Sequence, residues 1–238
     1  MKYFRILSLL FVGILASSSY AQFEKLEIIV SLSRPSCVRP CSDQGDIARR
    51  AARQTDGTPA DADTYLARAV LNFSGGKYRE TLNNYNSLIT MTPGDPQLYS
   101  SRAIVYTKLG NLKLAAADRQ AAGELFDRKV EANTDDPAVY MARGLYYGNA
   151  GDLQKELAEY ERAIELGMDT PQIHYYRGAS YLKFNEYEKA LNDLNRMVEL
   201  NPRLADSYKI RASLYQTLGD TQRAQADMQK YSELTKQR

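Results

Sequence analysis

The sequence predicts an all-α protein built from five antiparallel helix pairs, because residues of the same kind recur at a fixed period. An aromatic-type residue marks the first helix of each unit, with successive spacings of 34, 41, 34 and 34 residues, at Tyr65, Tyr99, Tyr140, His174 and Tyr208. Four positions after each marker comes a small residue: Ala69, Ala103, Gly144, Gly178 and Ala212. Seven positions further comes a turn residue: Gly76, Gly110, Gly151, Asn185 and Gly219.

The composition suits a folded protein and narrows the class of partner. Hydrophobic residues make up 44% of the 238 positions and charged residues 25%, which is ordinary for a globular chain. The 31 basic residues nearly balance the 29 acidic ones, whereas a nucleic-acid-binding protein needs a basic face. Two cysteines are too few for a disulfide-dense scaffold or a four-thiolate metal site.

Residues 1–21 are predicted to be a signal peptide. Lys2 and Arg5 precede an apolar run from Ile6 to Leu15, and Ser19-Tyr20-Ala21 has the small-x-small pattern of a cleavage site. A membrane anchor is the alternative, but the apolar run falls short of the roughly 20 residues that span a bilayer. We therefore expect an exported, soluble protein, periplasmic or secreted, with no membrane span in the mature chain.

Residues 22–61 form an N-terminal segment with a cysteine pair. Cys37 and Cys41 are expected to close a small disulfide loop in an oxidising compartment. A redox or covalent role for this pair is the sharper alternative, although redox pairs usually have a two-residue spacer at the start of a helix. Ser42 is suited to cap a short helix from about Asp43 to Gln54, which would cap the array that follows.

The array is predicted to cover residues 62–236, and its units differ in detail. The second unit is seven residues longer than the others, so its second helix is expected to be extended or the register locally offset. Glu156 stands where the other second helices carry a small residue that lets two helices approach. The five units are expected at 62–95, 96–136, 137–170, 171–204 and 205–236.

From Ala62 to Leu234 these markers resemble those of the tetratricopeptide repeat family. The resemblance implies a right-handed superhelical solenoid, because each helix pair buries only part of its apolar face and neighbours must stack to complete the core. It also implies a concave groove, lined mainly by the first helices, in which the partner usually lies.

An arginine also recurs in one register of the first helices, at Arg68, Arg102, Arg143, Arg177 and Arg211. Sixteen residues after each arginine comes a polar residue: Asn84, Asp118, Glu159, Asp193 and Asp227. The arginines could form a ladder for an anionic ligand, or one internal ion pair in each repeat. The matched acids favour internal pairs, which contribute more to register than to net stability.

No catalytic set is recognisable, so the chain is predicted not to be an enzyme. His174 is the sole histidine and stands where the other repeats carry tyrosine, so it is interpreted as a packed core residue rather than a base. No nucleotide-binding or nucleophile motif is present, and no Cys, Asp or Glu cluster has metal-ligand spacing. We therefore expect no cofactor and no metal.

The resemblance assigns partner binding to the groove face of the first helices. The positions there form a mainly apolar strip: Leu66, Val70, Phe73, Ile104, Lys108, Met141, Leu145, Tyr175, Leu182 and Lys183. Such a strip suits an amphipathic helix or an extended peptide. The family's carboxylate-clamp variant is disfavoured, because Leu66 and Val70 stand where it needs lysine and asparagine.

The leading functional hypothesis is an exported, non-catalytic scaffold or adaptor that binds another protein in this groove. Two alternatives stay open. One is the redox or covalent role of Cys37 and Cys41. The other is a self-assembling structural array or homodimer, formed through a last helix that carries Met228, Tyr231 and Leu234.

Overall fold

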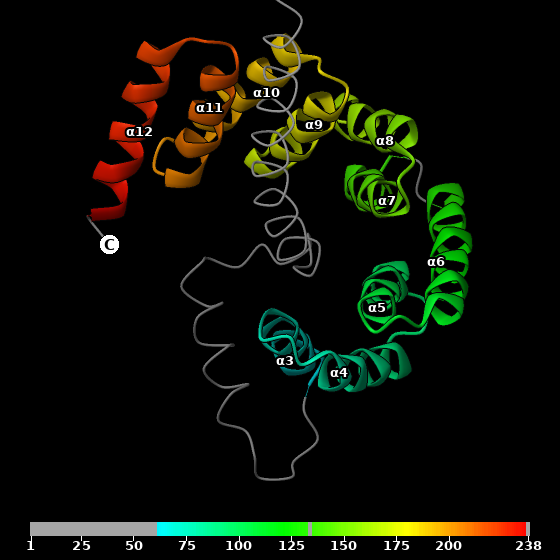
Figure 1. Ribbon diagram of the computed structural model, residues 1–238. Coiled ribbons are helices and arrows are strands. Elements are labelled where there is room, and N and C mark those ends of the chain that lie inside the picture. Colours follow the sequence, from blue (N-terminus) through cyan, green and yellow to red (C-terminus); the bar gives the residue numbers. More distant parts are fainter. Residues whose placement is uncertain (1–60, 133–134, 237–238) are drawn as a thin grey trace, which may run out of the picture. The chain divides into compact units, whose positions relative to one another are not determined.

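A computed structural model of the protein describes residues 61–132 and 135–236. This part of the chain forms ten α-helices and contains no strand (Figure 1), which confirms the all-α prediction. The helices follow one another as five pairs: α3 (Ala62–Ser74) and α4 (Tyr78–Met91), α5 (Pro96–Lys108) and α6 (Leu112–Ala132), α7 (Pro137–Ala150) and α8 (Leu153–Glu165), α9 (Pro171–Lys183) and α10 (Tyr187–Leu200), α11 (Ala205–Thr217) and α12 (Thr221–Lys236).

The predicted signal peptide, the Cys37–Cys41 loop and the short helix after Ser42 lie outside the described residues. Among the helices that are described, none combines the length and apolar character that crossing a bilayer requires.

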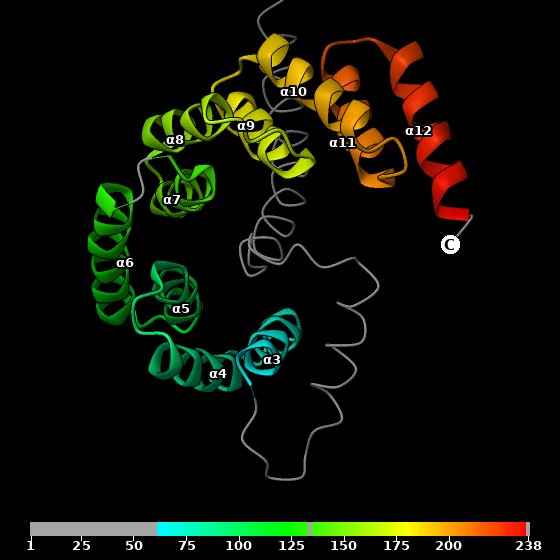
Figure 2. The same cartoon turned by 180° about the vertical axis from the view of Figure 1, so that it is seen from behind.

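The chain divides into two units, with the boundary inside α8 between Glu156 and Leu157. In the first unit, α3, α5 and α7 form one layer and α4 and α6 the other (Figures 1 and 2). In the second unit, α9 packs on α10, α10 on α11, and α11 on α12. Each unit therefore builds its core from helices that are close neighbours in the chain.

Capping residues and prolines explain where the first helices begin. The Asp95 carboxylate accepts a hydrogen bond from Gln97 N at 3.0 Å, and Asp136 accepts one from Ala138 N at 2.9 Å. A proline at the first helical position follows each cap. Its fixed φ suits a helix start, and its missing N–H has no intrahelical role there.

The turn inside each helix pair needs a residue with positive φ, as the glycine spacing predicts. Gly76, Gly110, Gly151 and Gly219 all adopt φ between 72° and 83°. In the fourth pair Asn185 takes this place with φ 59°. Asparagine is among the few non-glycine residues that tolerate the left-handed region, so the substitution preserves the turn.

The small residues of the predicted pattern lie where helices approach closely. Ala69, Ala103 and Ala212 are almost fully buried. At Gly178 an added Cβ would lie 3.3 Å from Cβ of Asp193 on α10. Large side chains fill the remaining core, including Tyr85, Leu88, Phe126, Tyr160, Tyr176 and Ile173.

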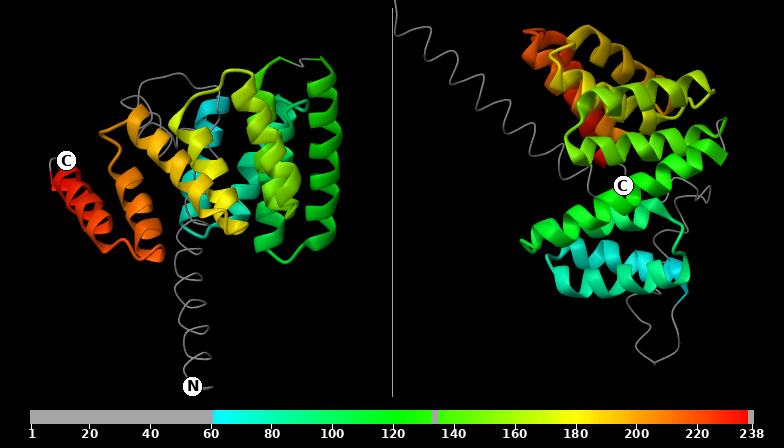
Figure 3. Two further views of the ribbon diagram at one scale, coloured as in Figure 1. Left: turned by 90° about the horizontal axis from the view of Figure 1, so that it is seen from above. Right: turned by 90° about the vertical axis from the view of Figure 1, so that its right-hand side faces the viewer.

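The seven additional residues of the second helix pair lengthen its second helix. Helix α6 has 21 residues, whereas α5 has 13, and Figure 3 shows its greater length. The added turns pack against α7, where the rings of Phe126 and Tyr146 lie 5.5 Å apart. Gly123 leaves room for this contact, because a Cβ there would lie 2.8 Å from Tyr146 Oη. The predicted extension of the helix is confirmed.

Glu156 takes the place of a small residue because α7 makes room for it. Its side chain is buried, and a Cβ added to Gly148 would lie only 2.6 Å from Glu156 Oε1. The small residue of this contact is therefore on α7 instead of α8.

Candidate functional site

The arginines of the first helices are used inside the fold. Arg102 donates through Nε and Nη2 to both oxygens of Asp118, each at 2.7 Å. Arg177 pairs in the same way with Asp193 at 2.9 and 2.8 Å. Arg211 pairs with Asp227 at 2.8 and 2.8 Å. These three predicted pairs are confirmed, and their bidentate geometry is the strongest form of this interaction.

The same arginines also reach back to the second helix of the preceding pair, which the sequence reasoning missed. Arg102 Nη1 donates to Asn86 Oδ1 at 2.8 Å, and Arg211 Nη1 donates to Asn195 Oδ1 at 3.0 Å. Each acceptor lies sixteen residues before its arginine. We call an arginine with its two partners an arginine clasp. Each clasp joins a helix pair to the pair before it.

The clasp at Arg177 has a more complex second partner. Arg177 lies within electrostatic reach of Glu161, which also stands sixteen residues before it. Glu161 Oε1 accepts a hydrogen bond from Tyr181 Oη at 3.0 Å. The sequence therefore contained a signal for these contacts, because a polar residue stands sixteen positions before Arg102, Arg177 and Arg211, at positions 86, 161 and 195.

The insertion in α6 preserves this spacing at Arg143. Its Nη1 donates to Asp127 Oδ1 at 3.3 Å, again sixteen residues before the arginine. Gln120 stands two residues after Asp118, as Asn195 does after Asp193. Seven residues make almost two full turns of an α-helix, so Asp127 lies on the same face of α6 as Gln120. The Asp127 side chain is 65% exposed, so solvent weakens this contact.

Tyrosine rings flank the clasps. The Arg102 guanidinium lies 5.6 Å from the ring centroid of Tyr99 and 5.7 Å from that of Tyr106. Arg211 lies 5.7 Å from Tyr208 and 5.8 Å from Tyr215. Within about 6 Å such a cation is attracted to the ring face. These four tyrosines therefore help to hold the arginines in place.

In the fourth pair His174 replaces one of these tyrosines. It is buried, as predicted for a core residue, but the sequence did not indicate its polar contacts. His174 Nδ1 lies 2.8 Å from Asp193 Oδ1, and Nε2 lies 2.8 Å from Asp169 Oδ1. Arg196 in turn donates to both oxygens of Asp169.

The charges of this cluster perturb one another. Burial lowers the pKa of His174, but the hydrogen bonds to Asp193 and Asp169 outweigh it, so the pKa is raised overall. The hydrogen bonds from Arg196 and then His174 lower the pKa of Asp169 to about 2. Asp169 is therefore ionised at neutral pH and is held by the cationic guanidinium of Arg196.

The predicted groove residues divide by burial. Phe73, Met141 and Tyr175 are buried, and the ring of Tyr175 lies 5.3 Å from that of Tyr176. These three side chains contribute to internal packing. Lys108 is exposed, and the others are half-buried: Leu66, Val70, Ile104, Leu145, Leu182 and Lys183.

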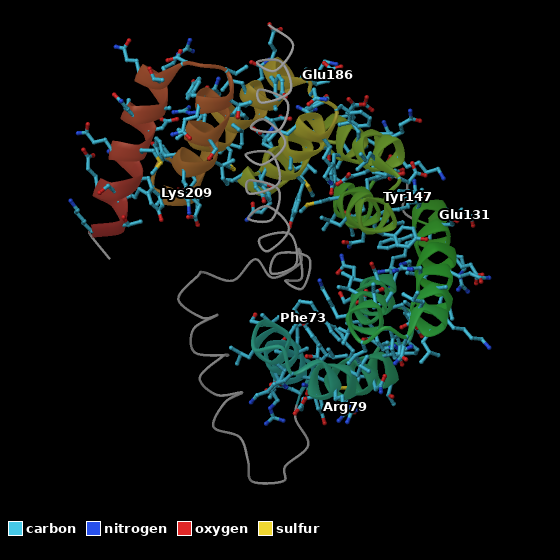
Figure 4. The ribbon with its side chains drawn as sticks, viewed as in Figure 1. Phe73, Arg79, Glu131, Tyr147, Glu186 and Lys209 are labelled. Atoms are coloured by element: carbon cyan, nitrogen blue, oxygen red, sulfur yellow. The ribbon has the colours of Figure 1, made fainter. Side chains whose placement is uncertain are left out.

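In the first unit, Leu66, Val70 and Ile104 pack partly against the core cluster around Ala69 and Tyr85. Figure 4 shows Phe73 of α3 on a different side of the first helix pair from Arg79 of α4. In the second unit it places Glu186 and Lys209 at opposite edges. The part of the chain that the structure describes contains no group of three His, Cys, Asp or Glu side chains arranged to hold a metal ion.

Two family models of the tetratricopeptide repeat match the chain, one over residues 137–166 and the other over residues 178–238. No curated protein sequence matches it. Among solved structures the chain is similar to TTC0263, a thermophilic TPR protein in Thermus thermophilus. The TM-score is 0.55 and the identity 21%, over 73% of this chain and 91% of that one.

The chain is also similar to MamA, from residue 41 to its end, of Desulfovibrio magneticus RS-1. The TM-score is 0.50 and the identity 18%, over 74% of this chain and 96% of that one. At these identities both similarities concern the fold.

Proposed function

Because this chain belongs to the tetratricopeptide repeat family, we propose that it is a non-catalytic scaffold that binds a peptide or amphipathic helix of another protein. The observation that carries the proposal is that the side chains of the first helices fall into two groups with different roles. The arginines and tyrosines hold the helix pairs together, whereas half-buried apolar side chains remain on the same helices. Such a surface suits recognition of an apolar helix face or an extended segment.

The proposed binding strip of the first unit consists of Leu66 and Val70 on α3, Ile104 and Lys108 on α5, and Leu145 on α7. These three helices form one layer of that unit (Figure 1). Leu66 and Val70 are four residues apart and so lie on one face of α3. Lys108 is exposed four residues after Ile104, so an acidic side chain at the edge of the ligand would complement it. In the second unit, Leu182 and Lys183 of α9 make the corresponding apolar and basic pair.

We further propose that the protein acts after export, in the periplasm or outside the cell. The support is the charge and hydropathy pattern of residues 1–21. N-terminal sequencing of the protein from its native host tests this. A mature chain that begins near Gln22 supports the proposal, and a chain that retains residues 1–21 contradicts it.

The binding strip is tested by charge reversal at Lys108, whose exposed side chain can be changed without disturbing the core. Proteins that crosslink to the wild-type chain in its host are identified. The amount of each that crosslinks to the Lys108→Glu variant is then measured. Lys113→Glu on α6 is the matched control, because Lys113 is also exposed but belongs to the other layer. We expect loss of the partner with Lys108→Glu only.

A second variant probes the apolar part of the strip. Leu66→Gln should weaken recovery of the same partner, whereas Leu71→Gln should not, because Leu71 lies on the same helix outside the strip and is already exposed. Circular dichroism confirms that both variants fold. Equal recovery by all four variants would contradict the assignment of the strip.

Self-association is the alternative assembly, favoured by the exposed Met228 on α12. Sedimentation equilibrium of the wild type and of Met228→Glu distinguishes it from partner binding. A monomer at high concentration argues against it.

A further inference from the structure

His174 lies where three segments of the second unit meet. Asp169 belongs to the loop of residues 166–170 between α8 and α9, His174 to the first turn of α9, and Asp193 to α10. One ring nitrogen faces each carboxylate at 2.8 Å. The imidazole therefore connects the loop to the buried side of the helix pair.

Only the protonated ring can satisfy both contacts. An ionised carboxylate accepts hydrogen bonds but cannot donate them, and a neutral imidazole has a single N–H. Both oxygens of Asp193 accept hydrogen bonds from the Arg177 guanidinium, and both oxygens of Asp169 accept hydrogen bonds from Arg196. With both partners restricted to accepting, both ring nitrogens must donate.

The surrounding charges decide which contact is lost when the ring releases its proton to water. Asp193 is 2% exposed and also bound by Arg177, so it is the partner that retains the remaining N–H, on Nδ1. The lone pair of Nε2 then faces the Asp169 oxygen and repels it. Arg196 of α10 stays with Asp169, and on the α8 side Glu161 faces Arg177 and Tyr181 instead of the imidazole.

We propose that His174 is a proton-dependent latch, which fastens the α8–α9 loop to α9 and α10 when the ring is protonated and releases Asp169 when it is neutral. This inference does not depend on the binding proposal. It concerns the segment that connects the third helix pair to the fourth.

In the fifth pair a tyrosine makes the corresponding contact to the preceding loop. Tyr208 stands 34 residues after His174, and its Oη donates to the carbonyl oxygen of Pro202 at 3.1 Å. Pro202 belongs to the loop between α10 and α11. The aromatic position therefore fastens the preceding loop in both pairs, and only the fourth uses a histidine.

The test is an NMR titration of the full chain without a histidine tag, in which the one histidine gives a unique ring signal. Protection factors of the loop amides, corrected for intrinsic exchange, are measured at each pH. We expect them to fall by about tenfold, the order for one lost hydrogen bond to a charged group, in step with deprotonation of His174. Unchanged loop protection across the titration would overturn the proposal.

Two variants separate the latch from general pH effects. His174→Tyr reproduces the side chain of the other repeats and should keep the loop protected at every pH. Asp169→Asn should lower the pKa of His174 and leave the loop weakly protected throughout. Wild-type pH dependence of the loop in His174→Tyr, or an unchanged His174 pKa in Asp169→Asn, would contradict the proposal. Circular dichroism checks that both variants fold.

Discussion

The fourth and fifth helix pairs build the same arginine clasp around different aromatic-type residues. In the fifth pair, Arg211 binds Asp227 and Asn195 and lies between two tyrosine rings. In the fourth pair, Arg177 binds Asp193 and has Tyr181 on one side, while His174 occupies the other tyrosine position.

The comparison shows that a histidine at this buried tyrosine position needs hydrogen-bond acceptors for its ring nitrogens. A buried imidazole beside a guanidinium would be costly without acceptors. Asp193 supplies one acceptor and Asp169 the second. In the fifth pair the position that corresponds to Asp169, 34 residues later, holds Arg203. Tyr208 therefore has no carboxylate there and donates to the backbone carbonyl of Pro202. The histidine therefore comes with an additional carboxylate, Asp169, that the tyrosine position of the fifth pair lacks.

Removing the shared acceptor should have the largest effect and should separate the two pairs. Asp193→Ala leaves both Arg177 and His174 without their buried partner, so we expect a loss of about 3 kcal/mol in unfolding free energy. Asp227→Ala removes the partner of Arg211 alone and should cost less. Urea unfolding of both variants measures this. Equal losses would mean that His174 contributes nothing to the cluster.

Filling the space beside Asp193 should have a smaller effect. In Gly178→Ala the new Cβ would lie 3.3 Å from Asp193 Cβ, so α10 or the side chain must shift, at about 1–2 kcal/mol. The fifth pair already has Ala212 at this position, which makes Ala212→Gly the matched control. Thermal unfolding compares the two. An unchanged melting temperature for Gly178→Ala would show that the fourth pair does not need the space.

The pH dependence of stability should also distinguish the pairs. The pKa of His174 is raised in the folded state, so its stabilisation is complete below the unfolded value of about 6.5. It is lost as pH rises through the folded pKa. His174→Tyr should remove this loss. Unfolding measured between pH 5 and pH 9 tests the sign, and the opposite slope would contradict a protonated His174.

The smallest effect is expected at the exposed contact between Arg143 and Asp127 in the first unit. Asp127→Ala removes a single 3.3 Å contact from a largely exposed carboxylate, so we expect a loss of at most about 0.5 kcal/mol. Asn86→Ala removes a shorter contact to Arg102 and serves as the comparison. A larger loss for Asp127→Ala than for Asn86→Ala would show that the exposure of a contact does not determine how much it stabilises the fold.

Contacts within a helix pair could be predicted because the spacing along the chain determines them. A fixed sixteen-residue separation across one turn brings Arg102, Arg177 and Arg211 opposite their aspartates. The turn itself needs a left-handed residue, which Gly219 and Asn185 supply. The seven additional residues of the second pair likewise predicted either an extended second helix or a local offset of the register, and α6 shows the extension.

Contacts between successive pairs were not predicted, although polar residues stand sixteen positions before Arg102, Arg177 and Arg211. They depend on the angle at which one pair packs on the next and on the rotamers chosen at that contact. This is why Asn86 and Asn195 were overlooked and why burial of Met141 and Tyr175 was not foreseen. The groove assignment depended on register alone, and register does not specify which side chains the neighbouring helices cover.

The sequence by itself determined the helix pairs, their turns and the arginine–aspartate pairs, because these follow from local spacing and backbone preference. Only the tertiary structure decided that the arginines of the clasps also hold the preceding pair. It likewise decided that His174 is a polar connection between a loop and two helices. Asp169 and Asp193 are far from each other in the chain, and folding alone brings both carboxylates to one imidazole.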